Sequence, residues 1–337
     1  MTEVVFAFSD GAEHRVTARP GQSLLDAGLD AGLPLLHQCR SGTCSTCEAH
    51  LAAGQAEPLP GASSTLLASE RAAGQRLLCV TEAMGDCRFE LAYDSKAGTG
   101  RPVEGHAFVN AVERIASDVI RLELELADGS WIDFRPGQFI QVKVPGTDVA
   151  RSYSIATTPA DLPRIELLIR LLQGGAMSQW LLEKAAVDDV LEISGPYGAF
   201  FLQDGIKAPH IMIAGGTGLA PMMSIIDSLR ARPGRKPPVV LSFGCQSELG
   251  LFHRDALDLR RHWLPTLDVV LSVDRGPAPD GVRVGNPVEA VGAAGPVDPA
   301  SVAYLCGPPG MIAAAREHLV KLGLDRSNIH AEQFVAS

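Results

Sequence analysis

Four cysteines have the spacing of an iron–sulfur cluster loop. Cys39, Cys44 and Cys47 lie within nine residues, and Cys79 follows 32 positions later. Four thiolates must converge on two irons from a tightly curved segment, and gaps of four and then two residues, with Gly42 inside, let the backbone wrap a cluster. The spacing therefore predicts a plant-type 2Fe–2S cluster with these four cysteines as ligands. Such a cluster moves single electrons, so the rest of the chain should contain an electron source.

Other uses of these cysteines fit the pattern less well. A zinc site usually pairs two short Cys-x-x-Cys hooks, whereas Cys79 stands alone in its segment. Seven cysteines in 337 residues are too few, and odd in number, for a disulfide framework. A Rieske centre needs two histidine ligands, and His37 lies outside that pattern. Buried structural thiols remain the alternative to a cluster.

Length, charge and hydropathy limit the class of protein. A chain of 337 residues with 46% hydrophobic residues suggests two or three domains with compact cores. No basic leader and no apolar run of 18 residues is present, so we expect a cytoplasmic protein that does not enter a membrane. The net charge is −10, and residues 1–95 hold twelve acidic against six basic side chains. This balance disfavours nucleic acid as a partner and suits a basic protein that docks near the cluster, although solubility alone would also explain it.

The hydropathy pattern divides the chain into three domains. Residues 1–95 are compact and strand-rich, and residues 96–104 are small and polar like a linker. Residues 105–205 alternate in short runs, as the strands of an antiparallel barrel do. Residues 206–337 alternate strands with helices, which indicates a parallel α/β sheet. The expected fold class is thus multidomain, with an α+β part and an α/β part.

The finer pattern predicts individual elements. A Ser-capped helix is expected at 23–32, and a second helix at 179–184. Strands are expected at 3–8, 14–18, 119–126, 139–144, 210–214, 239–243, 268–273 and 303–306.

Three polar or glycine-rich motifs in the second and third domains have the chemistry of nucleotide binding. Arg151-Ser-Tyr153-Ser154 places a cation and an aromatic ring on one face of a strand. Gly174-Gly175-Ala-Met177-Ser178 precedes a helix, where amide groups can bind a phosphate. Gly215-Gly216-Thr217-Gly218 follows a strand and opens a helix, which is the context of a dinucleotide phosphate loop, although it lacks the Rossmann Gly-x-Gly-x-x-Gly spacing. Either of the first two motifs alone is ordinary, but together, at this spacing and downstream of a cluster loop, they are a strong signal.

On these motifs the chain resembles, over almost its whole length, the reductase components of bacterial multicomponent oxygenases of the benzoate or terephthalate dioxygenase reductase type, within the ferredoxin–NADP reductase superfamily. The resemblance implies a β-grasp ferredoxin domain, an antiparallel β-barrel flavin domain and a parallel-sheet nicotinamide domain, in that order. It also implies FAD rather than FMN, because members that use FMN typically carry the cluster domain at the C-terminus.

The resemblance assigns roles to residues of the flavin motifs. Arg151 would bind the FAD pyrophosphate, Tyr153 would pack on the flavin, and Ser154 would donate a hydrogen bond near flavin N5. The second FAD element would contribute Gly174, Gly175, Met177 and Ser178.

The nicotinamide motifs and the C-terminus receive roles in the same way. The nicotinamide dinucleotide would contact Gly215, Gly216, Thr217 and Gly218, and the Cys-Gly-x-x-x-Met motif would contribute Cys306, Gly307 and Met311. Cys306 would lie beside nicotinamide C4 and flavin N5, although a small apolar residue at a strand end is the commoner role of a cysteine. Phe334 would cover one flavin face and Glu332 would lie close to Ser154; the alternative is a final strand with Phe334 in the core. Ser154, Cys306 and Glu332 are then the expected catalytic residues.

The choice between NADH and NADPH depends on what meets the adenosine ribose after the second strand of the sheet. The segment 244–252 offers Glu248 and no cation, which favours NADH, because a 2′-phosphate would need a positive partner. Arg254 is the residue that could reverse this choice.

The resemblance implies an NADH-dependent oxidoreductase that passes electrons through FAD and a 2Fe–2S cluster to a terminal oxygenase component. A hydride delivers two electrons at once, and the flavin and cluster release them singly. We expect a monomer that binds its partner transiently near the cluster. Two alternatives remain: a reductase for another acceptor, such as a deoxysugar dehydratase, and a redox sensor without turnover.

Overall fold

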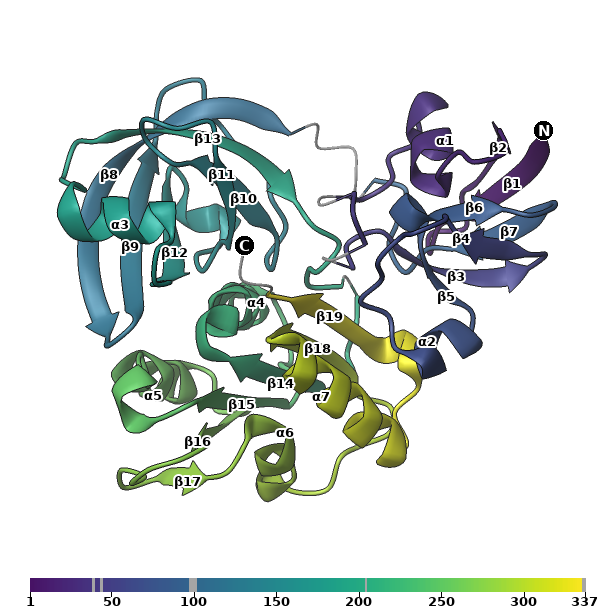
Figure 1. Ribbon diagram of the computed structural model, residues 1–337. Helices are drawn as coiled ribbons and strands as arrows, with labels where there is room; N and C mark the ends of the chain where they lie inside the picture. The colour runs from purple at the N-terminus through teal and green to yellow at the C-terminus, as the bar shows by residue number, and fades with distance from the viewer. Residues whose placement is uncertain (38–39, 43–44, 97–101, 204, 335–337) are drawn as a thin grey trace. The chain divides into compact units, whose positions relative to one another are not determined.

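The computed structural model describes residues 1–37, 40–42, 45–96, 102–203 and 205–334, without the side chains of Ala293 and Ala294 (Figure 1). The chain forms two compact units. The first starts at Met1, extends into the linker and includes Tyr197–Ala199, and the second comprises Pro102–Pro196 and the chain from Phe200 onward. Among the described residues, no helix is both long and apolar enough to cross a membrane.

The first unit is built on a mixed five-stranded sheet with strand order β2-β1-β7-β3-β5. β1 and β7 pair in parallel and the other pairs are antiparallel, which is the β-grasp arrangement expected from the resemblance. Helix α1 begins at the Ser23 cap, whose hydroxyl accepts a hydrogen bond from Asp26 N, as predicted. The elements are β1 (Thr2–Ala7), β2 (Glu13–Ala18), α1 (Leu24–Asp30), β3 (Glu48–Ala53), β4 (Ala56–Pro58), α2 (Ala68–Ala72), β5 (Gln75–Leu77), β6 (Thr81–Ala83) and β7 (Cys87–Glu90).

The core of this unit forms between α1 and the sheet. Phe6 of β1 and Phe89 of β7 stack with ring centroids 6.2 Å apart, and both side chains are fully buried. Gly28 of α1 leaves room for the side chain of Leu35, because a Cβ at position 28 would lie 2.3 Å from Leu35 Cδ1. β4 and β6 pair antiparallel in a separate ribbon, and β6 begins two residues after Cys79.

The second unit begins with a six-stranded antiparallel sheet of order β11-β10-β13-β8-β9-β12. Its two edges meet, because Ile155, directly after β11, forms a bridge with Leu167 of β12, and the sheet closes into the expected barrel. Apolar side chains alternate inward along the strands and fill the interior. The elements are β8 (Val103–Ala116), β9 (Val119–Leu126), β10 (Phe139–Lys143), β11 (Ala150–Ser154), β12 (Arg164–Arg170), α3 (Ala176–Glu183) and β13 (Val190–Tyr197).

Helix α3 differs from the expectation of a helix over 179–184. It begins at Ala176, because Gly175 takes the N-cap position and Met177 of the first turn is buried in the barrel core. Apolar packing thus extends the helix one turn toward the glycine pair, where polarity alone had suggested a loop.

The rest of the second unit is a parallel six-stranded sheet of order β17-β16-β15-β14-β18-β19. Helices cover both faces: α4 and α5 pack on one, and α6 and α7 on the other (Figure 1). The elements are β14 (His210–Gly215), α4 (Leu219–Ala231), β15 (Val239–Cys245), α5 (Arg254–Trp263), β16 (Leu267–Val273), β17 (Val282–Val284), α6 (Pro287–Ala290), β18 (Val302–Gly307), α7 (Pro309–Lys321) and β19 (Ile329–Gln333).

The strand order of this sheet reverses at β14, between β15 and β18. Ligands of open α/β sheets bind at such a switch point, beyond the carboxyl ends of the strands. Gly215 and Cys306 stand at the carboxyl ends of β14 and β18, so the topology brings the two predicted nicotinamide motifs to one edge.

Candidate functional site

Glycines make close packing possible between the two nicotinamide motifs. A Cβ on Gly218 would lie 2.2 Å from Cys306 O, and a Cβ on Gly215 would lie 2.8 Å from Met311 Sδ. Gly307 has a φ of 156° and also packs against Met311. Gly216, Thr217 and Gly218 form a 3-10 turn that leads directly into α4. The structure therefore joins the predicted residues 215–218, 306, 307 and 311 in one patch at a helix N-terminus, where amide groups can bind phosphate.

Ser154, Cys306 and Glu332 meet where the barrel contacts the parallel sheet. Cys306 and Glu332 are register partners on β18 and β19. Ser154 ends β11 and donates a hydrogen bond from Oγ to Glu332 Oε2 at 3.3 Å. Ser154 and Glu332 are 178 positions apart in the chain, and the side chains of all three residues are buried. The expected approach of Glu332 to Ser154 is present in the structure.

Burial raises the pKa values of Glu332 and Cys306, the two titratable side chains of this trio. The pKa of Glu332 is raised to about 8 by burial, which outweighs the opposing effect of the Ser154 hydrogen bond. Burial also raises the pKa of the Cys306 thiol well above its usual range, and the neighbouring Glu332 adds to the shift. At neutral pH the site thus holds a protonated carboxyl and a neutral thiol, so Cys306 acts here as a small side chain and not as a thiolate nucleophile.

A further side-chain hydrogen bond joins the barrel to a helix of the parallel-sheet domain, and charged groups lie near one another close by. Ser224 of α4 donates from Oγ to Thr157 O at 2.5 Å. Arg121 of β9 bonds Glu166 of β12 at 3.1 Å, and His253 Nε2 lies 3.8 Å from the same carboxylate. Burial and the nearby Arg260 and Arg121 lower the pKa of His253 to about 4, so its ring is neutral at ordinary pH.

The barrel motif Arg151-Ser-Tyr153-Ser154 forms strand β11 at one end of the sheet. Tyr153 packs against the barrel core, and burial raises the pKa of its hydroxyl. Arg151, on the same strand face, is partly exposed and donates from Nη1 to Ala150 O at 3.0 Å. Its guanidinium therefore keeps further donors for an anion.

The second glycine motif caps helix α3. Gly174 has a φ of 72°, and Gly175 is the N-cap residue. Ser178 Oγ accepts a hydrogen bond from Leu172 N at 2.8 Å, which closes the turn and leaves the hydroxyl hydrogen to donate to a ligand. The side chain of Met177, in contrast, is directed into the barrel core. The amides at this helix start, together with Ser178, suit a phosphate.

Phe334 follows β19 directly. Its backbone N donates to Gly307 O at 2.9 Å, and its ring is partly buried against the core that contains Cys306. The predicted final strand is present, but it ends at Gln333 and leaves Phe334 beyond it. The aromatic ring is thus held at the edge where the nicotinamide motifs meet.

The sequence reasoning missed a charged group near the end of β15. Arg170 ends β12 and bonds Asp118 Oδ2 from Nε at 3.1 Å. Asp118 and Arg170 both lie close enough to the buried thiol of Cys245 to affect its pKa, which burial raises to about 12. Half-exposed Arg170 thus places a cation close to the carboxyl end of β15. Sequence reasoning could have identified Arg170 from its position four residues before the Gly174-Gly175 pair.

Glu248 and Arg254, on which the choice between NADH and NADPH depends, follow the carboxyl end of β15 in the chain. Glu248 begins a short 3-10 turn after β15 and is exposed. Arg254 begins α5 and donates from Nη2 to Asp280 O at 2.9 Å. That bond occupies part of the guanidinium that a 2′-phosphate would need.

In the first unit, two of the four predicted cluster ligands can be described. Cys47 and Cys79 are buried, and Cys79 N points at Cys47 Sγ at 3.5 Å. An amide directed at a cysteine sulfur suits a thiolate that binds iron. Cys39 and Cys44 lie outside the described residues. Elsewhere in the described chain, Cys87, Cys245 and Cys306 are buried free thiols.

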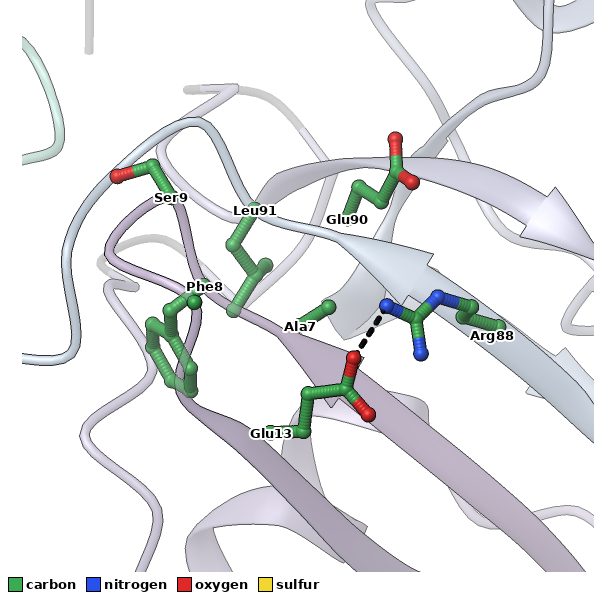
Figure 2. A pocket seen from close by; sticks show the side chains of 8 residues that line it. Ala7, Phe8, Ser9, Glu13, Arg88, Glu90 and Leu91 are labelled. Atoms are coloured by element: carbon green, nitrogen blue, oxygen red, sulfur yellow. Dashed lines mark hydrogen bonds and ion pairs between the residues drawn. The ribbon is translucent and has the colours of Figure 1, made fainter.

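A separate pocket of about 270 Å³ lies at the β1–β2–β7 end of the first unit (Figure 2). Its facing charges, Glu13 and Arg88, bond each other at 2.6 Å. It contains none of the predicted site residues, so we assign the chemistry to the motifs above.

Comparison with known proteins gives the same order of domains. The 2Fe-2S iron-sulfur cluster binding domain matches residues 7–84, the oxidoreductase FAD-binding domain 106–202, and the oxidoreductase NAD-binding domain 212–317. The chain belongs to the reductase, or electron transfer, components of multicomponent oxygenases, a branch of the ferredoxin–NADP reductase superfamily. Its cofactors are accordingly FAD, a 2Fe–2S cluster and a nicotinamide dinucleotide.

Individual relatives cover almost the full length. The chain is 31% identical to the reductase component of propane 2-monooxygenase from Rhodococcus jostii, over 96% of this chain and 92% of that protein. It is 34% identical to the reductase subunit of an aromatic O-demethylase from Amycolatopsis, over 98% and 99%. It is 30% identical to the electron transfer component of toluate 1,2-dioxygenase from Pseudomonas putida, over 99% of each chain.

Solved structures agree with the fold. A cytochrome P450 reductase from Amycolatopsis superposes with a TM-score of 0.74 at 30% identity, covering 99% of each chain. The ferredoxin reductase of carbazole 1,9a-dioxygenase superposes with a TM-score of 0.68 at 26% identity, covering 99% of this chain and 98% of the other.

Proposed function

We propose that this protein takes electrons from NADH and passes them through FAD and its 2Fe–2S cluster to a terminal oxygenase component. The observation that carries the proposal is the meeting of Ser154, Cys306 and Glu332 at the edge where the nicotinamide and flavin motifs converge. A cluster-binding domain on the same chain provides the exit for single electrons. When bound, the flavin accepts a hydride from NADH and releases its two electrons singly, and the cluster passes each one on.

The side chains bind and orient the cofactors in this proposal. Arg151, Gly174, Gly175 and Ser178 hold the FAD pyrophosphate, with the hydroxyl hydrogen of Ser178 as a donor. Tyr153 and Phe334 pack on the flavin. Met177 supports the same turn from inside the barrel, because its side chain is buried there.

The residues at the sheet edge orient the nicotinamide. Gly215, Gly216, Thr217 and Gly218 offer backbone amides to its phosphates. Met311 fills the space beside Gly215 and Gly307, which keeps the two loops together. Cys306 is small, neutral and buried, so the nicotinamide ring can approach the flavin closely.

Ser154 and Glu332 hold a proton beside the reacting rings. Ser154 Oγ donates to Glu332, and the carboxyl itself is protonated below about pH 8. A neutral hydrogen-bonded pair places no negative charge beside the site where hydride arrives. We infer NADH as the donor because exposed Glu248 offers an acid to the adenosine ribose.

The domain limits and the mode of partner binding are part of the same proposal. Residues 1–95 form the cluster domain, 96–104 the linker, 105–205 the flavin domain and 206–337 the nicotinamide domain. The protein works as a cytoplasmic monomer and docks transiently, through its acidic cluster domain, on a basic surface of the oxygenase. Net charges of −6 for residues 1–95 and −4 for the rest of the chain support docking through the cluster domain.

Electron transfer to an oxygenase can be tested with the purified, cofactor-loaded protein. Rapid mixing with NADH without oxygen should first bleach the flavin and then produce the spectrum of the reduced cluster. Addition of a terminal oxygenase component that this protein serves should then couple NADH oxidation to hydroxylated product. NADH-dependent cluster reduction that no oxygenase reoxidises, while a dehydratase does, would overturn the choice of acceptor. Absence of steady turnover with every acceptor, including cytochrome c, would favour a sensor.

A further inference from the structure

A second loop of the cluster domain packs tightly on the cluster loop. It connects β4 to α2, and a hydrogen bond from Leu59 N to Val80 O ties its start to the segment after Cys79. A Cβ on Gly42 would lie 2.1 Å from Ser63 O in this second loop, and Gly42 has a φ of 78°. Both the contact and the backbone conformation require glycine at position 42.

Thr65 of this second loop binds the cluster loop at two positions. Its backbone N donates to Gly42 O at 3.0 Å. Its Oγ1 lies 3.3 Å from Gly42 O and 3.1 Å from Ser45 Oγ. Gly42 precedes Thr43 and Cys44 in the sequence, and Ser45 follows them, so Thr65 binds the described residues that flank this pair in the sequence.

The direction of these bonds follows from the donors available. Gly42 O can only accept, so the single hydroxyl hydrogen of Thr65 is donated to it. Thr65 Oγ1 can then only accept from Ser45, whose own hydroxyl hydrogen is used in this bond. Ser45 is 7% exposed and has a φ of 58°, an uncommon conformation for a residue with a side chain. The chain of bonds thus orients a buried hydroxyl directly beside Cys44 in the sequence.

We propose that Thr65 is a positioning residue for the 2Fe–2S cluster. It fixes the loop on both sides of Cys44 and commits the Ser45 hydroxyl hydrogen to an oxygen atom, which prevents it from bonding to a sulfur. Hydrogen bonds to the sulfurs raise the reduction potential of such clusters. Thr65 therefore keeps the potential lower than the free Ser45 hydroxyl would make it, which favours onward transfer of the electron. This inference rests on the cluster assignment within the proposed function and is independent of the final acceptor.

Four variants of the full-length, cofactor-loaded protein test the proposal. Thr65→Val keeps the shape and removes the hydroxyl, Thr65→Ser keeps the hydroxyl, Ser45→Ala removes the second hydroxyl, and the fourth combines Thr65→Val with Ser45→Ala. The readout is the ratio of reduced to oxidised cluster, from the electron paramagnetic resonance signal, in equilibrium with a redox dye. No oxygenase is needed, so failure here is distinct from failure of the proposed function.

Thr65→Val should raise the ratio of reduced to oxidised cluster about threefold at fixed ambient potential, which is about 28 mV at 59 mV per tenfold change for one electron. Thr65→Ser and Ser45→Ala should each match the native protein, and the double variant should lose the shift. An unshifted Thr65→Val, or a shift shared by Thr65→Ser, would overturn the proposal. If Thr65→Val retains no cluster, Ser45→Ala decides: an unchanged ratio supports the proposal, and a lowered ratio shows that Ser45 already bonds to sulfur and overturns it.

Discussion

Replacement of Glu332 by glutamine should remove a pH dependence from the stability of the flavin and nicotinamide unit. Glu332 has a pKa of about 8 in the folded protein, against an ordinary value of 4.5, because the carboxyl is buried between β11 and β18. A glutamine side chain at this position would keep the size and the hydrogen bond from Ser154, but it cannot lose a proton. Glu332→Gln therefore isolates the titration from the packing.

The sign and size of the effect follow from proton linkage. The folded pKa is raised, so the protonated carboxyl contributes stability that is complete below pH 4.5 and is lost as the pH rises to about 8. Between pH 6 and pH 8 the native protein should lose about 2 kcal/mol of unfolding free energy through this group. Glu332→Gln should keep the unfolding free energy that the native protein loses through this group between pH 6 and pH 8.

Urea unfolding of the FAD-loaded protein at pH 6, 7 and 8, followed by the fluorescence of released flavin, measures this difference. Glu317→Gln is the matched control, because it makes the same substitution at an exposed position of α7. An infrared band of a protonated carboxyl at pH 7 should disappear in Glu332→Gln. Equal pH slopes in the native protein and Glu332→Gln would show that this carboxyl ionises in its ordinary range, and the proposed neutral pair with Ser154 would fail.

Three further predictions concern the cofactors. Cys79→Ser should lose the visible cluster absorbance and most cytochrome c reduction while NADH still reduces the flavin, and full iron content would contradict the ligand assignment. Arg151→Ala should weaken FAD binding by about 2 to 4 kcal/mol, measured as FAD lost on gel filtration, because a cation is removed from a phosphate; stoichiometric retention would point to another pyrophosphate partner. Cys306→Ala should slow flavin reduction by NADH in stopped flow without slowing the step from flavin to cluster, and the opposite pattern would place the nicotinamide elsewhere.

Local sequence signals predicted the order of the cluster, flavin and nicotinamide domains and a part of the secondary structure. The cysteine spacing, the glycine loop at 215–218 and the alternation of apolar residues each act within a few residues, so they can be recognised without a fold. The Ser23 cap and the parallel strands appeared where these signals indicated. The start of α3 was missed by one turn because burial of Met177 in the barrel core, and not local polarity, sets it.

Only the tertiary structure decided which of these groups meet and in what state. Ser154 and Glu332 are 178 residues apart, and their hydrogen bond depends on the packing of the barrel against the parallel sheet. The raised pKa of Glu332 comes from burial, which no sequence pattern around it reveals. The bonds from Thr65 to Ser45 and Gly42 likewise join residues that are 20 and 23 positions apart. Sequence spacing identifies the groups that can do the chemistry. The distances between these groups, their burial and the direction of their hydrogen bonds arise from long-range packing, which a local pattern does not encode.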